Sequence, residues 1–230
     1  MLRRWPVHDT IMPVRAQRLS TWQLVVPVKS RHAAKSRLVP PSGVFRSDLA
    51  LAFARDTLTA IAEVISADRL FVVTSDDRIR AQLRIGGAHV VDDPGRGLNP
   101  AVEAGVQVAR DNDSDAPVGI LLGDLPALTP GDLRLALAAC AAVESAVVPD
   151  RSGMGTVLLT HQEAGRVAPR FGHGSALRHG QTARRLDLDL PRLRTDVDDL
   201  EALRQAVALG LGRHTAAVLH NADLDVEQLG

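Results

Sequence analysis

The chain has 230 residues, 45% of them hydrophobic, and its 27 Lys and Arg balance its 27 Asp and Glu. This length and composition are typical of an ordinary globular domain, and no apolar run is long enough to cross a membrane. The balanced charge and the scarcity of aromatic residues (four Phe, two Trp, no Tyr) argue against binding of nucleic acid. We therefore expect an aliphatic core and neither a nucleic-acid partner nor a membrane partner.

The start of the chain and its single cysteine indicate the compartment. Residues 1–21 contain Arg and Pro but no apolar segment of a secretory signal. They predict a flexible N-terminal extension, with Met12 as an alternative start, followed by a single domain over residues 22–230. Cys140 cannot form an internal disulfide and lies in an Ala-rich helical pattern, so we interpret it as a core residue of a cytoplasmic protein.

Short apolar runs alternate with amphipathic patterns along the first 140 residues. Strands are predicted at residues 24–28, 69–75, 89–93 and 118–122, and helices from Ser47 or Asp48 to Ile65, over 76–83, over 101–110 with Asn99 as N-cap, and after Thr129-Pro130. Such alternation predicts a parallel sheet with helices on both faces.

The pattern changes in the last third of the chain. The segments there are an apolar run at 146–150, a turn at Gly153 and Gly155, a run at 156–160, a Pro/Gly/His loop at 169–174, a helix, and a strand at 193–195. The two runs around the glycines predict a hairpin, and hence an antiparallel strand. We expect an α/β three-layer sandwich with a mixed, mostly parallel central sheet.

Carboxylates follow two of these predicted strands. Asp124 follows the apolar run 120–122 after Gly123, and Asp196 and Asp198 follow the strand at 193–195. Ligands bind at the carboxyl ends of strands in open α/β sheets, and residues two apart on an extended segment share a face. Because Mg²⁺ prefers carboxylates, water and phosphate, these three aspartates predict a magnesium site. The alternatives are turn and helix caps, and we favour a cap only for Asp199.

A basic loop follows the first predicted strand. Lys29, Arg31, Lys35 and Arg37 cluster there, and a triphosphate needs several such cations as well as a metal. The loop lacks the glycine spacing of a Walker A motif or a dinucleotide fingerprint, which disfavours those two classes. A solvated basic loop is the alternative interpretation, and the position at the ligand edge makes the two equally strong.

The loop at 169–174 has the character of an anion site. Gly172 and Gly174 let the backbone approach a ligand, and Ser175 begins a helix whose free amides suit a phosphate or carboxylate. Arg170 and Arg178 would add positive charge. An ordinary helix cap is the alternative for Ser175.

Three other polar residues are considered: Asn99 has two interpretations, and His173 and His179 have one each. Asn99 is either a helix cap or a contact of the nucleotide base. His173 and His179 have no metal-ligand spacing, so both are interpreted as loop residues.

Several of these motifs occur in one order along the chain. They are Val26–Leu38, Gly97–Asn99, Leu122–Leu128, Asp150–Thr156, Arg170–Ala176 and Asp196–Asp198. In this combination the chain resembles, over residues 24–209, the 2-phospho-L-lactate and phosphoenolpyruvate guanylyltransferases of coenzyme F420 biosynthesis. Molybdenum-cofactor nucleotidyltransferases carry a similar Gly-Asp-x-Pro motif but open with a Gly-rich loop that this chain lacks. The N-terminal extension departs from the family pattern without touching a motif.

The resemblance implies a nucleotide-diphospho-sugar transferase-like fold and a reaction that joins GTP to a three-carbon phosphoacid with release of pyrophosphate. The resemblance also implies the roles of individual residues. Thr156, Gly172 and Ser175 would bind the phosphoacid, and Asp124, Asp196 and Asp198 would bind Mg²⁺. Lys29, Lys35 and Arg37 would face the triphosphate and, with Asp124, would be catalytic, while Gly97 and Asn99 would lie near the nucleoside. No general base is expected, because the phosphate oxygen of the acceptor is already ionised at neutral pH.

The identity of the acceptor rests on composition. The Ala- and Arg-rich, Lys-poor chain resembles actinobacterial members, which are of the phosphoenolpyruvate type, while 2-phospho-L-lactate and 3-phosphoglycerate stay open. A molybdopterin or sugar nucleotidyltransferase is a second interpretation, and a nucleotide-binding module without catalysis is a third. A labile product would favour hand-off to the next transferase, and a homodimer is a further expectation.

Overall fold

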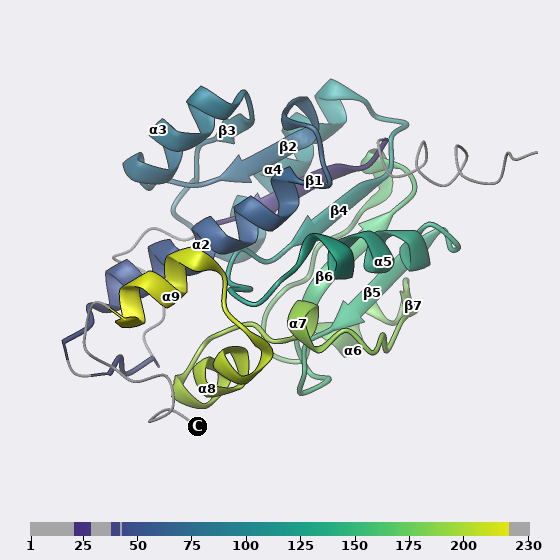
Figure 1. The fold of residues 1–230 in the computed structure, drawn as a ribbon. Helices are drawn as coiled ribbons and strands as arrows, with labels where there is room; N and C mark the ends of the chain where they lie inside the picture. The colour runs from purple at the N-terminus through teal and green to yellow at the C-terminus, as the bar shows by residue number, and fades with distance from the viewer. Residues whose placement is uncertain (1–20, 29–37, 42, 221–230) are drawn as a thin grey trace, which may run out of the picture.

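The computed structural model describes residues 21–28, 38–41 and 43–220, and a single central sheet organises them (Figure 1). The strand order is β3-β2-β1-β4-β6-β5-β7. The strands are β1 (Gln23–Pro27), β2 (Leu70–Val73), β3 (His89–Val91), β4 (Val118–Leu121), β5 (Ser145–Pro149), β6 (Thr156–His161) and β7 (Arg184–Arg185). β6 runs antiparallel to β4 and β5, and the other pairs of neighbours are parallel.

Helices cover both faces of the sheet. They are α2 (Arg46–Ala62), α3 (Asp77–Gly86), α4 (Leu98–Asn112), α5 (Pro130–Cys140), α6 (Ser175–His179), α7 (Pro191–Arg194), α8 (Leu200–Leu209) and α9 (Arg213–His220), with short 3₁₀ turns at Ala67–Arg69 and Ala164–Arg166. Leu24 and Val26 of β1 pack with α2, α3 and α5, whereas Val25 packs with α4 on the other face. Both faces of β1 are therefore buried, and the predicted three-layer sandwich with a mixed, mostly parallel sheet is confirmed.

A third apolar cluster fixes the C-terminal helices. Residues of α2, α8 and α9 pack together beside the sheet, where Figure 1 shows α9 alongside α2. The buried carboxylate of Asp56 in α2 accepts hydrogen bonds from the backbone N–H groups of His214 (2.9 Å) and Thr215 (2.8 Å), and so caps the start of α9. The Gly212 N–H donates to the Pro126 carbonyl (2.8 Å), which ties the same region to the loop after β4.

Several local predictions are confirmed. Thr129 caps α5 through Asp132 N–H (3.1 Å), with Pro130 as its first residue, and Asp199 caps α8 through Ala202 N–H (2.8 Å). Cys140 is fully buried, and burial raises the pKa of its thiol to about 11, as expected for a core residue.

Three local predictions are wrong. α2 begins at Arg46 with Phe45 as N-cap, not at Ser47 or Asp48, and α4 begins at Leu98 with Gly97 (φ 100°) as N-cap, not Asn99. The predicted strand at 193–195 is absent from the described residues, because Pro191 begins the short helix α7 there.

Other predictions about the chain stay untested. Residues 1–20 of the predicted N-terminal extension lie outside the described residues, and the single domain and the cytoplasmic location remain predictions. In the part of the chain that the structure describes, no helix has the length and apolar character needed to cross a membrane.

Candidate active site

The sheet changes direction of winding between β1 and β4. From β1 the chain proceeds to β2 and β3 on one side, and β4 lies on the other side. The carboxyl ends of two such strands leave a crevice that binds ligands in open α/β sheets. A cavity of about 120 Å³ lies there, between the ends of β1 and β4, the start of α4 and one turn of α2, and Asp124, Asp196 and Asp198 line it.

A backbone hydrogen bond joins the two acidic segments. The Val197 N–H donates to the Asp124 carbonyl at 3.1 Å, so residues 196–198 lie against the end of β4. Val197 is fully buried, while Asp196 and Asp198 on either side of it line the cavity. This alternation is the shared face that the extended spacing predicts. The structure thus brings the three predicted aspartates to one cavity, and their role as metal ligands stays a prediction.

Close packing of the two central strands fixes the position of Asp124. A Cβ at Gly123 would lie 2.9 Å from the Pro27 carbonyl oxygen and 2.9 Å from a methyl carbon of Val28, so only glycine fits there. On the other side, the Leu125 N–H donates to Thr57 Oγ1 of α2 (3.0 Å). The predicted triphosphate residues Lys29, Lys35 and Arg37 lie outside the described residues, so their roles stay predictions.

The acidic residues do not form a complete metal-binding cluster by themselves. Within residues 21–28, 38–41 and 43–220, no group of three or more His, Cys, Asp or Glu side chains is placed to hold a metal ion. Mg²⁺ typically uses only one or two carboxylates and completes its shell with water and phosphate oxygens. The all-oxygen donor set of the cavity fits such a hard cation when a phosphorylated substrate supplies the remaining ligands.

The antiparallel strand β6 delivers Thr156 to the same edge. The Leu122 N–H donates to the Val157 carbonyl (3.0 Å), which extends the β4–β6 ladder by one residue. Because β6 runs opposite to β4, its first residue lies beside the end of β4, next to Gly123 and Asp124. Thr156 is buried at this point, with 3% of its surface exposed.

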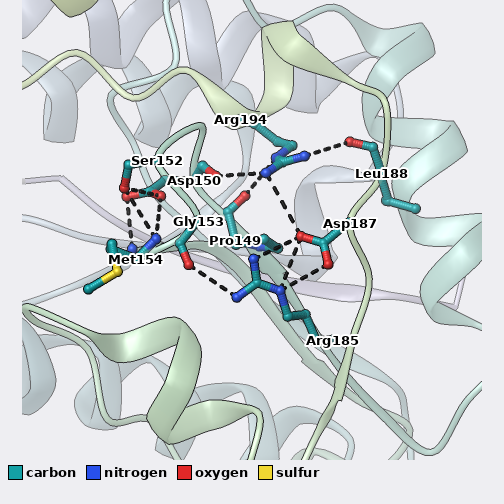
Figure 2. Close-up of polar contacts among 10 residues, drawn as sticks. Pro149, Asp150, Ser152, Gly153, Met154, Arg185, Asp187, Leu188 and Arg194 are labelled. Carbon is teal, nitrogen blue, oxygen red and sulfur yellow. Dashed lines mark hydrogen bonds and ion pairs between the residues drawn. The ribbon is translucent and has the colours of Figure 1, made fainter.

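A rigid turn precedes Thr156 (Figure 2). The Asp150 carboxylate accepts hydrogen bonds from Ser152 Oγ (2.8 Å), Met154 N–H (3.1 Å) and Gly155 N–H (2.9 Å). A Cβ at Gly155 would lie 2.3 Å from that carboxylate, so this glycine is required for the turn. The Asp150–Thr156 motif is therefore a positioning device for the start of β6.

Two arginines hold this turn from outside (Figure 2). Arg185, paired with Asp187, donates to the Gly153 carbonyl (3.1 Å). The Arg194 guanidinium donates to the carbonyls of Pro149 (3.1 Å), Asp150 (3.0 Å) and Leu188 (3.1 Å).

Arg194 also lies two residues before Asp196, and its own carbonyl accepts from Arg151 N–H at 2.7 Å. The acidic segment and the turn before Thr156 are thereby fixed to each other. No local pattern in the sequence indicates this role, because the guanidinium binds carbonyl groups of segments distant in sequence.

Thr156, Ser175 and His179 form a buried hydrogen-bonded cluster. Ser175 Oγ bonds Thr156 Oγ1 at 3.0 Å, and His179 Nδ1 lies 2.9 Å from the same Thr156 oxygen. The Arg170 N–H donates to His179 Nε2 at 2.8 Å. At most 3% of each of the three clustered residues is exposed.

This cluster corrects two interpretations. Ser175 is not the helix cap, since Gly174 (φ 70°) is the N-cap of α6 and the Ser175 hydroxyl bonds Thr156 instead. His179 is not a loop residue but the buried last residue of α6. The signal that could have found it is the four-residue spacing of Ser175 and His179, which places both on one face of a helix.

Burial keeps the His179 imidazole neutral. Desolvation, and then the charges of Arg178 and Arg170, lower its pKa to about 4. The ring also lies edge-on to Phe171, with 5.0 Å between the ring centroids.

The predicted anion site of free amides is wrong for the first two amides of α6. The Ser175 N–H donates to the Gly172 carbonyl (3.0 Å) and the Ala176 N–H to the Met154 carbonyl (3.0 Å). Arg178 donates to the carbonyls of Arg170 and His173, so it stabilises the loop. Donors for a ligand at this place must therefore come from the hydroxyl groups or from the glycine-containing loop, where Gly172 has a φ of 124°.

Asn99 anchors that loop to α4. Its amide nitrogen donates to the Phe171 carbonyl (3.0 Å), and its amide oxygen accepts from the Phe171 N–H (2.7 Å). These two bonds explain why Asn99 does not cap the helix. Contacts of Gly97 and Asn99 with a nucleoside stay predictions.

Solved structures show that the α/β sandwich with the acidic cavity at its topological switch has the nucleotide-diphospho-sugar transferase-like fold. A protein of Desulfovibrio desulfuricans G20 assigned to the nucleotide-diphospho-sugar transferases has a TM-score of 0.62 and 18% identity, over 91% of this chain and 98% of its own. A nucleotidyl transferase from Methanothermobacter has a TM-score of 0.53 and 19% identity, over 82% and 97%.

Sequence comparison identifies the family. Residues 22–229 match the family described as "Guanylyl transferase CofC like". The chain is 44% identical to the phosphoenolpyruvate guanylyltransferase of Thermomonospora curvata (86% of this chain, 88% of the relative) and 45% identical to that of Streptomyces coelicolor (86% and 95%). The chain belongs to the CofC-like guanylyltransferase family and is a nucleotidyltransferase, as the resemblance predicts.

Proposed function

We propose that this enzyme transfers the guanylyl group of GTP to phosphoenolpyruvate. A phosphate oxygen of phosphoenolpyruvate bonds to the α-phosphorus of GTP, and the bond from that phosphorus to the oxygen bridging to the β-phosphate breaks. Pyrophosphate leaves, and the product is enolpyruvoyl-2-diphospho-5'-guanosine. This assignment is supported by the names of relatives that match most of the chain at 44–45% identity.

One observation carries the proposal from this chain's own residues. The hydrogen bond from Leu122 N–H to the Val157 carbonyl sets Thr156 beside the end of β4, where Asp124 begins the acidic cavity. A site for the triphosphate and a site for the acceptor phosphate then lie next to each other, as an in-line displacement requires. In this proposal Thr156, Ser175 and Gly172 bind the phosphoacid.

Asp124, Asp196 and Asp198 would hold Mg²⁺ in this reaction. When bound there, the ion would offset phosphate charge, including that of the pyrophosphate as it leaves. Lys29, Lys35 and Arg37 would offset the remaining charge of the triphosphate, and Gly97 and Asn99 would lie near the nucleoside. The acceptor oxygen is ionised at neutral pH and needs no base. What the residues of the site have to do is orient the two substrates and exclude competing acceptors.

The test is pyrophosphate release from GTP and Mg²⁺ with phosphoenolpyruvate, 2-phospho-L-lactate or 3-phosphoglycerate in parallel. Because we expect a labile product that is handed to the next enzyme, the downstream transferase and its deazaflavin acceptor are included. Turnover with phosphoenolpyruvate at least tenfold above the other two acids is expected. Preference for another acid would correct the acceptor, and GTP binding without turnover on any acid would contradict the proposal. A homodimer stays a prediction.

A further inference from the structure

The buried cluster around Thr156 has a defined hydrogen-bond direction. The Arg170 backbone N–H is an obligatory donor, and it points at His179 Nε2 at 2.8 Å. That nitrogen must therefore be the acceptor, without a proton. A neutral imidazole then carries its hydrogen on Nδ1, which donates to Thr156 Oγ1 at 2.9 Å.

With this direction, the cluster of Thr156, Ser175 and His179 has one more hydrogen than it has internal hydrogen bonds. The cluster contains three hydrogens: one on His179 Nδ1, one on the Thr156 hydroxyl and one on the Ser175 hydroxyl. It contains two internal hydrogen bonds, His179 to Thr156 and Ser175 to Thr156. One hydroxyl hydrogen is left over, whichever way the hydroxyl groups rotate, and no hydrogen bond among the described residues uses it.

The opposite direction would remove this donor. If Nδ1 accepted, the Thr156 hydroxyl would donate inward to the ring, and the Ser175 hydroxyl would donate to Thr156. Both hydroxyls would then present only lone pairs outward, which repel a phosphate or a carboxylate. The tautomer of the buried His179 ring therefore determines whether the Thr156–Ser175 hydroxyl pair attracts or repels an anion.

We infer that His179 is a positioning residue for the acceptor: its Nδ1–H makes the Thr156–Ser175 pair a net donor toward the anionic phosphoacid. This inference rests on the proposed function and assigns a residue that does not itself touch the substrate. The ring is held for this task by the Arg170 N–H, by edge contact with Phe171 and by burial. Arg170 and Arg178 are the charged groups near it.

Three variants separate this role from simple support of the loop. His179→Phe keeps an aromatic ring against Phe171 and removes both polar contacts. His179→Asn places an amide nitrogen near the position of Nδ1, so it can still donate to Thr156, but it cannot reach the Arg170 N–H. His179→Gln places an amide oxygen near the position of Nε2, so it retains the Arg170 contact and loses the donor to Thr156.

Steady-state kinetics give the readout. His179→Phe removes one hydrogen and one internal bond of the cluster, so one hydroxyl hydrogen is still left over, but no ring N–H holds it in the outward direction. We therefore expect the KM for phosphoenolpyruvate to rise about threefold, less than for loss of a whole hydrogen bond to a charged group, with the KM for GTP unchanged. The KM of His179→Asn for phosphoenolpyruvate should be closer to the wild-type value than that of His179→Gln. The reverse order would show that His179 only supports the loop through Arg170, and equal rises in both KM values would also overturn the inference.

A double variant tests whether His179 acts through Thr156. Thr156→Val removes the hydroxyl that receives the Nδ1–H. Adding His179→Phe to Thr156→Val should raise the KM for phosphoenolpyruvate less than twofold further. A further rise as large as that of His179→Phe alone would show that His179 acts by another route.

A spectroscopic measurement decides the direction without any turnover. The ¹⁵N resonances of His179 in the full-length protein at pH 7, assigned by their loss in His179→Gln, should show a protonated Nδ1 and an unprotonated Nε2. An Nε2–H tautomer or an imidazolium would overturn the inference. If the wild-type enzyme proved inactive on every phosphoacid, the proposed function would fail separately, while this spectrum would still confirm or exclude the hydrogen-bond direction.

Discussion

The aspartate cavity and the hydroxyl cluster lie at one edge of the sheet but are built in opposite ways. The cavity gathers Asp124 and the 196–198 segment through one backbone hydrogen bond, and no complete metal cluster forms among the described residues. The hydroxyl cluster is fixed by buried side-chain bonds, from Ser175 and His179 to Thr156.

In the proposed function, this difference follows from what each side would bind. A cation and a triphosphate would complete the acidic side, because Mg²⁺ takes only one or two carboxylates and fills its shell with water and phosphate oxygens. Neutral hydroxyls can be arranged in advance, because their hydrogen bonds satisfy one another in a buried place. The acidic side should therefore control the rate, and the hydroxyl side should control the choice and affinity of the acceptor.

The largest effect should come from the acidic side. Asp124→Asn removes the negative charge at the end of β4 while keeping its shape, and we expect kcat to fall by about 10³-fold because charge neutralisation of the triphosphate is lost. Pyrophosphate release and thermal unfolding check the result, with an unchanged Tm expected.

Asp199→Asn is the matched control for this variant. It changes an aspartate of the same acidic segment that caps α8 and does not line the cavity, and Asn caps helices equally well. We expect less than a twofold change in kcat. Similar losses in both variants would mean that net charge, not the cavity, determines the rate.

On the hydroxyl side, Ser175→Ala should raise the KM for the phosphoacid about tenfold and the KM for GTP less than twofold. The variant removes the hydroxyl that binds the phosphoacid in the proposed function, and a hydrogen bond to a charged ligand contributes about 1.5–3 kcal/mol. Ser152→Ala is the control, since its exposed hydroxyl bonds only Asp150 and the Met154 N–H, both within the turn before β6. Equal effects of Ser175→Ala on both substrates would contradict a division of labour between the two sides.

The sequence predicts the framework of this site because its signals are local. Apolar runs of four or five residues with helical patterns between them predict the parallel sheet, and the paired runs around Gly153 and Gly155 predict the antiparallel β6. The resulting topology places Asp124 at the ligand edge.

What the sequence could not predict depends on distant contacts. In the sequence, nothing distinguishes Arg194 from a surface arginine. In the structure its guanidinium donates to three carbonyl groups, two of which belong to residues more than 40 positions away in the chain. Asn99 has an ideal capping position but bonds Phe171, because a tertiary partner satisfies both ends of its amide. The strand expected at 193–195 is lost because Pro191 begins a helical turn.

A smaller effect should come from Asn99. Asn99→Ala removes two hydrogen bonds that hold the Phe171 backbone, so the loop before Ser175 should loosen and the KM for the phosphoacid should rise about threefold to fivefold. If Asn99 instead contacts the nucleoside, the KM for GTP will rise more than that for the phosphoacid. Parallel titration of both substrates decides between these outcomes, and Gln107→Ala on the exposed face of α4 is the control.

The last effect concerns stability under acid rather than kinetics, and it follows from the lowered pKa of His179. Its ordinary value is 6.5 and its value in the fold is about 4, so between these pH values the unfolded chain binds a proton that the folded protein does not. The free energy of unfolding therefore falls as the pH falls through this window, by about 1.4 kcal/mol per pH unit from this residue. His179→Gln does not titrate, so between pH 7 and pH 5 the wild-type protein should lose about 2 kcal/mol more than the variant in urea unfolding. Identical losses would mean that His179 is charged or exposed in solution, and the hydroxyl cluster would then lack the fixed direction that distinguishes it from the aspartate cavity.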